Sequence, residues 1–209
     1  MILSANAVRI AYAFAADSDI RYYLNGVNVE PAPGGGALIT ATNGHMMVQV
    51  HDTDASNVEP AIISLSKATR SFLKRGTYVS TEFEEKRIAV LSGDRVPLHL
   101  QFERYEIEAK YPDIQAVLGA REDWTAGFQG AFNVSYLAQI SLLLDEVVDK
   151  RHRLSGCVSF YSRPGKLGTN EDQGPVLFIL EGRFKAWGMV MPMRGDERNP
   201  LDVAYGKAA

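Results

Sequence analysis

The sequence has very few of the residues that build disulfides and metal sites. Its 209 residues include one cysteine, Cys157, and four histidines that are spread along the chain. A single cysteine excludes an internal disulfide and a cysteine-based metal cluster, and it fits a reducing compartment. Isolated histidines do not supply the ligand spacing of a metal site. We therefore expect neither a metal nor a cofactor.

Long apolar runs are missing as well. A helix that spans a bilayer needs a run of about 18 or more apolar residues, and the chain has no such run. The N-terminal segment lacks the basic-then-apolar order of a signal peptide, because Arg9 lies inside its apolar part. These absences predict a cytoplasmic protein without membrane association.

Neither sign of charge dominates the composition. Lysine and arginine total 22, aspartate and glutamate total 25, and the net charge is −3. This balance gives no global reason to expect nucleic-acid binding, although a basic stripe on one face is sufficient for contact with DNA. A hydrophobic content of 46% is ordinary for a globular chain, and the length predicts one or two domains.

Motifs of catalysis are absent too. The chain has no nucleophile elbow, no phosphate loop and no HExxH sequence. The run 34–36 of three glycines opens a predicted strand rather than a helix, so we interpret it as a turn. His45 has Asp52 and several serines nearby in sequence, but a triad requires mutual hydrogen-bond reach, which nothing here indicates. We predict that the protein is not an enzyme.

The segment from Arg21 to Val50 predicts a three-stranded meander. Extended runs at 21–30, 37–42 and 45–50 are separated by turn-forming residues. Asn43-Gly44 joins the last two runs, and this dipeptide is the strongest short-range signal for a hairpin with a type I′ turn, in which both central residues have positive φ.

One order of elements, a strand, a helix and three strands, occurs three times with a period of about 60 residues, near 1–54, 60–118 and 127–194. The predicted strands are 2–3, 21–30, 37–42, 45–50, 61–65, 77–83, 87–92, 96–102, 128–134, 157–161, 176–181 and 184–191, and the predicted helices are 5–16, 67–74 and 135–148. Residues 162–175 are interpreted as a mobile loop. The pattern predicts an α+β fold of βαβββ repeats, with antiparallel sheets and helices on one face.

Three motifs resemble those of one protein family, and they occur in that family's order. RYYLNG at 21–26 and ATNGHMM at 41–47 resemble the middle domain of the beta subunit of DNA polymerase III, the bacterial sliding clamp. The segment 111–118 is similar to the one that closes this domain. FNVSYL at 132–137, with VMPMR at 190–194, is similar to the last half of the C-terminal domain.

This resemblance implies a DNA-clamp fold, in which two βαβββ units form a domain and a bacterial chain has six units. We count three units here, so we predict a complete clamp domain at 1–118, an incomplete domain of one unit at 119–195 and a flexible tail at 196–209. The segment 124–127 stands where a whole first unit of the last domain would be expected.

The resemblance also implies a groove that receives short peptides from polymerases and other replication proteins. The matching positions are Leu24, Thr42, Gly44, His45, Met46, Met47, Pro112, Val117, Met191, Pro192, Met193 and Arg194. Met46 and Ala116 each replace a basic residue of the family. We therefore expect a more apolar groove that is less selective for acidic peptide residues.

Five of the six methionines gather at two strand ends, and Met189 joins the groove residues on this ground. Methionine is flexible and polarisable, which suits a surface that binds several ligands. Periodicity alone favours the alternative that these methionines fill the core, and the resemblance favours the groove.

Five basic residues belong to the first two predicted helices or their ends, which line the central hole of the clamp fold. They are Arg9, Lys67, Arg70, Lys74 and Arg75. Such side chains would contact phosphates without reading sequence. The alternative is an ordinary charged helix surface that keeps the protein soluble.

Taken together, the sequence predicts a sliding clamp or processivity factor that encircles double-stranded DNA and binds DNA polymerase and clamp-loader peptides. A clamp-derived adaptor that keeps the groove without forming a ring is the alternative. Because a bacterial ring contains twelve units, three units per chain predict a homo-oligomer, a tetramer first and a dimer second. We also expect the tail to be disordered or to fold back towards the groove.

Overall fold

The computed structural model describes residues 1–82, 84–102, 106–118, 124–126, 133–147, 158–164, 173–180 and 185–191. Several predictions lie outside these residues: most of the strand at 128–134, the groove positions Pro192, Met193 and Arg194, and the tail at 196–209.

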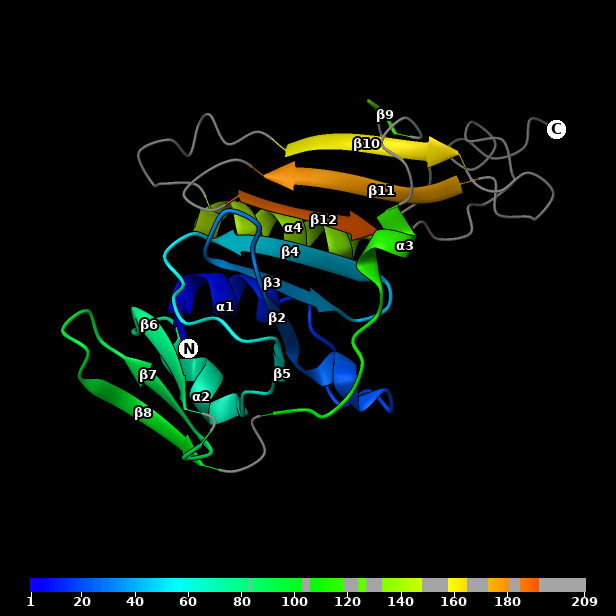
Figure 1. Cartoon of the computed structure of the whole chain (residues 1–209). Helices are drawn as coiled ribbons and strands as arrows, with labels where there is room; N and C mark the ends of the chain where they lie inside the picture. The colour runs from blue at the N-terminus through cyan, green and yellow to red at the C-terminus, as the bar shows by residue number, and fades with distance from the viewer. Residues whose placement is uncertain are drawn as a thin grey trace, which may run out of the picture.

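The first two units have the predicted order of elements, and the mixed α+β architecture with antiparallel sheets is confirmed (Figure 1). The first unit consists of β1 (Ile2–Ser4), α1 (Ala5–Tyr12), β2 (Val27–Pro31), β3 (Ala37–Thr42) and β4 (Met46–Asp52), and a 3-10 helix, η1 (Tyr22–Asn25), precedes β2. The second unit consists of β5 (Ala61–Ile63), α2 (Lys67–Phe72), β6 (Tyr78–Glu82), β7 (Arg87–Leu91) and β8 (Pro97–Phe102).

A short helix, α3 (Ile114–Leu118), leads to the third set of elements. These are β9 (Thr125–Ala126), α4 (Val134–Val147), β10 (Val158–Pro164), β11 (Gln173–Leu180) and β12 (Lys185–Val190). Neither α3 nor β9 was predicted, because both are too short to show a periodic pattern.

The first two units exchange their first strands. β1 of the first unit pairs with β6 of the second, and β5 of the second unit pairs with β2 of the first. As a result, a four-stranded sheet has the order β1-β6-β7-β8, and neither unit closes its sheet with its own strands alone.

The third unit continues the sheet of the first. β12 pairs antiparallel with β4 from Val190 opposite Met46 to Lys185 opposite His51. The resulting sheet has eight strands in the order β5-β2-β3-β4-β12-β11-β10-β9. Trp187 Nε1 donates a hydrogen bond of 3.1 Å to Gln49 Oε1 across this junction, on the face opposite to α1 and α4.

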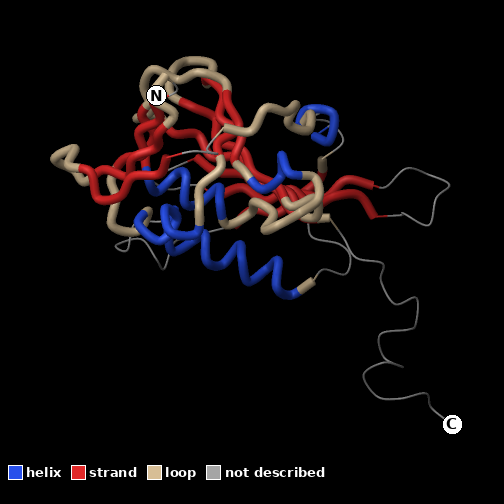
Figure 2. The backbone as a smooth tube through the Cα atoms, turned by 90° about the horizontal axis from the view of Figure 1, so that it is seen from below, coloured by secondary structure: helices blue, strands red, loops and turns tan. Residues whose placement is uncertain are grey.

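Helices α1, α2 and α4 lie on one face of the sheets, and the buried side chains form a single core (Figure 2). α1 and α4 contact each other, and both pack on the eight-stranded sheet. The rings of Phe14 and Phe178, which follow α1 and lie on β11, are 6.1 Å apart and fully buried. Ile140 of α4 is also buried in this core.

A buried carboxylate joins the end of β4 to the start of α1. Asp52 accepts hydrogen bonds from the Ser4 amide at 2.6 Å and from Ser4 Oγ at 2.7 Å, and its side chain is fully buried. Ser4 therefore occupies the N-cap position of α1 without capping it, because its hydroxyl is already bound to Asp52. Ser66, in contrast, caps α2 by accepting a hydrogen bond from the Thr69 amide.

Tyr12 links α1 to the second unit. Its hydroxyl donates to the Ile63 carbonyl at 3.0 Å and accepts from the Leu65 amide, and the Arg70 guanidinium lies 5.5 Å from the ring centre. Burial raises the pKa of the phenol to about 12. The folded protein therefore retains the proton more strongly than the unfolded chain does.

We expect an alkaline loss of stability that depends on Tyr12. Its contribution is complete below the ordinary pKa of 10.0 and is lost as the pH rises towards about 12. The free energy of unfolding should fall by up to about 1.4 kcal/mol per pH unit in this window. Urea unfolding of the wild type and of Tyr12→Phe at several pH values measures this loss. The wild type should be more stable than the variant below pH 10, and the difference in their free energies of unfolding should shrink between about pH 10 and 12. A constant difference would contradict the assignment.

The segment at 21–30 is not one strand, which corrects the prediction. Residues 22–25 form η1, and β2 begins only at Val27. Asn25 explains the local fold, because its side-chain amide binds both the N–H and the carbonyl of Asp19. The first helix also ends at Tyr12 rather than at 16, since the Ala16 amide donates to the Leu24 carbonyl instead of continuing the helix.

The predicted loop at 162–175 is partly strand. β10 extends to Pro164 and β11 begins at Gln173, with a register shift between Ser162 and Pro164. The strand ends could not be predicted, because residues 162–175 are rich in polar residues, glycine and proline, which are typical of loops. The division of the chain into domains at 118 stays a prediction.

Candidate functional site

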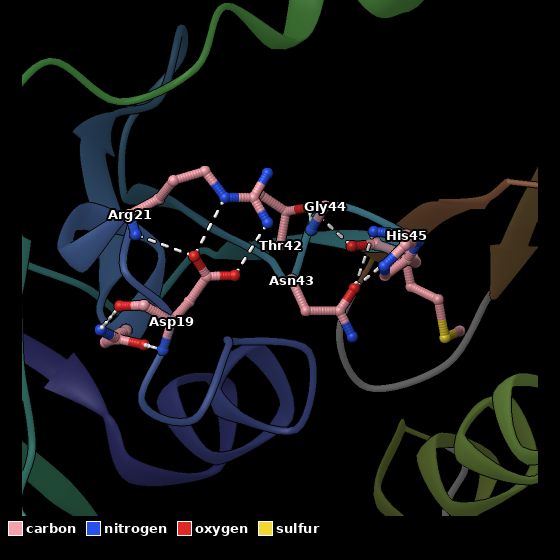
Figure 3. Close-up of polar contacts among 8 residues, drawn as sticks. Asp19, Arg21, Thr42, Asn43, Gly44 and His45 are labelled. Carbon is pink, nitrogen blue, oxygen red and sulfur yellow. Dashed lines mark hydrogen bonds and ion pairs between the residues drawn. The ribbon is translucent and has the colours of Figure 1, made fainter.

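The loop between β3 and β4 is shaped by two polar side chains (Figure 3). Asn43 Oδ1 accepts hydrogen bonds from the His45 and Met46 amides, both at 2.9 Å. Thr42 Oγ1 donates to the Met46 carbonyl and accepts from the Gly44 amide. Gly44 has a φ of +88°, but Asn43 does not have a positive φ, so the predicted type I′ turn is wrong.

An ion pair in the residues that precede η1 contacts the same loop. The Arg21 guanidinium donates to Asp19 Oδ1 at 3.0 Å and to Oδ2 at 2.8 Å (Figure 3). These hydrogen bonds lower the pKa of the Asp19 carboxyl to about 2. A Cβ atom on Gly44 would lie 2.9 Å from Arg21 Nη2, so the loop and the guanidinium are in close contact.

His45 joins the loop to two elements of the third unit. Its ring stacks on Tyr136 of α4, with ring centres 6.2 Å apart and planes inclined by 16°. Its carbonyl accepts a hydrogen bond of 2.8 Å from the amide of Met191, directly after β12. Both His45 and Met191 are exposed, so they present a ring and a thioether to solvent side by side.

The segment around α3 borders the same end of β3. Tyr111 Oη accepts a hydrogen bond of 3.0 Å from the Thr42 amide, and burial raises the pKa of this phenol above its usual range. Pro112 and Val117, in the next residues, are exposed. An apolar hollow of about 320 Å³ extends from α3 along the neighbouring strands, lined by Leu118, Leu177, Ile179, Leu180, Lys185, Ala186 and Trp187.

The methionines divide between the core and the surface. Met47 and Met189 face each other across the β4–β12 junction and are 5% and 2% exposed, and Met46 belongs to the core with 2% exposure. The side chain of Met46 therefore fills the core, and its place in the groove stays a prediction. Met191, with 42% exposure, remains available. Leu24 is also buried, at 2%.

The structure therefore brings most of the described groove positions to one place, where the first unit, the third unit and α3 meet. The exposed members are Gly44, His45, Pro112, Val117 and Met191. Three contributors were missed from the sequence: Tyr136, Tyr111 and Arg21. Tyr136 lies inside the FNVSYL motif and could have been found there, whereas the role of Tyr111 depends on a contact across 69 residues.

The basic residues do not form one continuous set of free charges. Arg9 of α1 is half-buried and donates to Asn6 Oδ1. Lys67 and Arg70 of α2 lie 3.6 and 3.8 Å from the carboxylate oxygens of Asp17. Lys74 and Arg75, after α2, are exposed.

Other kinds of site were also sought among the residues with defined positions. Within the described ranges, no three histidine, cysteine, aspartate or glutamate side chains are grouped to hold a metal ion. In that part of the chain, no helix is long and apolar enough to cross a membrane.

The arrangement of βαβββ units with helices on one face is that of DNA sliding clamps, as comparison with solved structures establishes. The sliding clamp (DNA polymerase III subunit beta) of Bartonella birtlesii, bound to griselimycin, matches with a TM-score of 0.55 and 14% identity over 93% of this chain and 66% of that one. The Caulobacter crescentus pol III beta matches with a TM-score of 0.54 and 14% identity, and 93% and 65% of the two chains are covered. The beta subunit of the Streptococcus pyogenes DNA polymerase matches with a TM-score of 0.51 and 16% identity over 93% of this chain and 66% of that one.

The chain thus has the fold of the DNA polymerase III beta subunits, and it spans about 65% of the length of these solved structures. No protein-family model and no curated protein sequence matches it.

Proposed function

We propose that the protein is a sliding clamp that encircles double-stranded DNA and tethers replication proteins, including a polymerase and a clamp loader, through a peptide groove at His45. The observation that carries this proposal is the fold itself, in which α1, α2 and α4 cover one side of the antiparallel sheets, as in the solved clamps. Such a protein acts by binding, and we propose no catalytic step.

Contact with DNA is assigned to the helix side. Lys74 and Arg75 are exposed at the end of α2, and Lys67 and Arg70 stand on the helix itself. Their ion pairs with Asp17 are exposed and therefore weak, so phosphates can compete for both side chains. Contacts of this kind hold DNA without sequence preference and weaken with salt.

The proposed ring is a homo-oligomer of even order, with the tetramer as the first expectation and the dimer as the second. The test is to assemble the oligomer in the presence of a circular plasmid and then to cut the plasmid with a restriction enzyme. A closed ring stays on the circle during gel filtration and leaves the linear DNA through its ends. Retention on both forms, or on neither, would contradict encirclement.

We expect Met191→Glu to weaken peptide binding by at least about 2 kcal/mol, which is roughly a thirtyfold rise in Kd. The physical reason is that a carboxylate would replace an exposed apolar side chain beside His45, where a peptide has to be desolvated. Calorimetric titration with a polymerase-derived clamp-binding peptide measures the change.

Val96→Glu is the matched control, because Val96 is an exposed apolar residue that precedes β8, on the four-stranded sheet. It should leave the Kd of the peptide unchanged. Equal affinity of the Met191→Glu variant and the wild type would refute the groove.

A clamp-derived adaptor that binds peptides without encircling DNA is the second candidate. It is favoured by the basic residues of α1 and α2, because Lys67 and Arg70 are paired with Asp17 and Arg9 is half-buried. Peptide binding that depends on Met191, combined with no topological retention on DNA, would identify this function.

A further inference from the structure

The methionines near the His45 loop differ in their access to solvent. Met46, Met47 and Met189 are 2%, 5% and 2% exposed, whereas Met191 is 42% exposed. Met46 belongs to the core, and Met47 lies opposite Met189 across the β4–β12 junction. Among these described methionines, Met191 is therefore the one whose side chain a small solute can reach without any opening of the fold.

The backbone of Met191 is fixed by contacts that its side chain does not make. Its amide donates a hydrogen bond of 2.8 Å to the His45 carbonyl, and Val190 just before it pairs with Met46 in the sheet. Both contacts use main-chain atoms only. A chemical change at the sulfur of Met191 can therefore alter the surface beside His45 while these hydrogen bonds stay in place.

We propose that Met191 is a modification site, at which hydrogen peroxide oxidises the thioether to the sulfoxide and thereby weakens peptide binding. In this step the sulfur forms a bond to one peroxide oxygen while the O–O bond breaks. The departing hydroxide takes the proton of the transferred oxygen and leaves as water. The sulfur loses two electrons, and the peroxide gains them.

The consequence for binding rests on the proposed groove, whereas the selectivity among the methionines rests on their exposure alone. The sulfoxide is polar, and its oxygen accepts hydrogen bonds from water in the free protein. A peptide that covers Met191 has to remove this water, and burial of a polar group without a new partner costs free energy. The loss therefore falls on the complex and not on the fold.

The position of the sulfur decides which of these effects an oxidation has. A sulfoxide at Met46 would place a polar oxygen in the core and destabilise the folded chain. At Met191 the oxygen points to a surface that is already hydrated, so the urea midpoint should stay the same. Binding and oxidation are also linked reciprocally, because a bound peptide covers the side chain that the peroxide has to reach.

Treatment of the folded protein with hydrogen peroxide tests the proposal. Tandem mass spectrometry of proteolytic peptides should show that Met191 gains oxygen at least about tenfold faster than Met46, Met47 and Met189, which react only after local opening. A saturating amount of the polymerase-derived clamp-binding peptide should slow the reaction at Met191. Calorimetry should give a Kd that is at least about tenfold higher after oxidation.

Reversal of the oxidation separates methionine from cysteine chemistry. Methionine sulfoxide reductases for both sulfoxide epimers, supplied with dithiothreitol, should restore the original Kd. Dithiothreitol alone should not, since it reverses only the oxidation of a thiol, and Cys157 is the single cysteine of the chain. Met191→Leu is the matched variant, because leucine has no sulfur: whatever its own Kd, peroxide treatment should not change that value.

Equal oxidation rates of Met191 and the three buried methionines would overturn the selectivity. An unchanged Kd of the oxidised wild type, or a peroxide-dependent loss that persists in Met191→Leu, would overturn the effect on binding. If the untreated protein binds no clamp-binding peptide, the groove fails and the effect on binding fails with it. The oxidation rates in the absence of peptide still decide whether Met191 is the selective site, so the two failures are distinguishable.

Discussion

Asp52→Ala should destabilise the protein by at least about 3 kcal/mol, because it leaves the Ser4 amide and hydroxyl buried without an acceptor. Each unsatisfied buried donor costs about 1–3 kcal/mol, and a cavity adds to the loss. Ser4 ends β1, so the substitution separates β4 from the strand that enters the second unit. Urea unfolding followed by circular dichroism measures the free energy.

Asp54→Ala is the control for this substitution. Asp54 is exposed and only two residues away, so its loss should change the free energy of unfolding by less than about 0.5 kcal/mol. If the two variants unfold at the same urea concentration, the buried carboxylate does not join β4 to α1 in the way described.

Gly188→Ala should cost at least about 2 kcal/mol, through overpacking at the junction of the first and third units. An added Cβ would lie 2.2 Å from the Met47 carbonyl oxygen and 2.4 Å from Phe178 Cζ. The Met47 carbonyl belongs to the backbone of β4, and the Phe178 ring is fully buried in the core. Neither group can move aside without disturbing the hydrogen bonds or the packing around it. The same urea unfolding assay measures this cost.

Gly93→Ala is the matched glycine control, because an added Cβ there meets only Thr77 Oγ1 at 3.7 Å. It should leave stability nearly unchanged. Phe178→Leu in the Gly188→Ala background should recover part of the loss, since it removes one of the two clashes. Full stability of Gly188→Ala alone would show that β12 and β4 pack less closely than the structure indicates.

Elements that carry their own periodic pattern could be predicted from the sequence. The helix at 135–148 and the strands at 87–92 and 96–102 agree closely with α4, β7 and β8, because their signals are local. The turn at Asn43-Gly44 failed although its dipeptide is typical, since the side chains of Thr42 and Asn43 bind the loop amides and select a different backbone.

The candidate site depends on pairings that no local pattern encodes. His45 meets Tyr136 and Met191 only because β4 pairs with β12, and this register joins residues more than a hundred positions apart. The same register buries Met47 and Met189, whose exposure could not be decided from methionine content alone. The resemblance to clamps predicted which residues belong to the groove, and the fold determines which of these residues are exposed.

The exchange of first strands between the first two units also constrains how the chain folds. Ile2 pairs with Ser80, so β1 finds its sheet partner only after most of the second unit has been synthesised. Loops this long must be closed before the contact stabilises anything, which slows folding. A chain growing on the ribosome therefore leaves β1 without its partner strand until β6 has been synthesised, whereas β2 to β5 can already pair with one another.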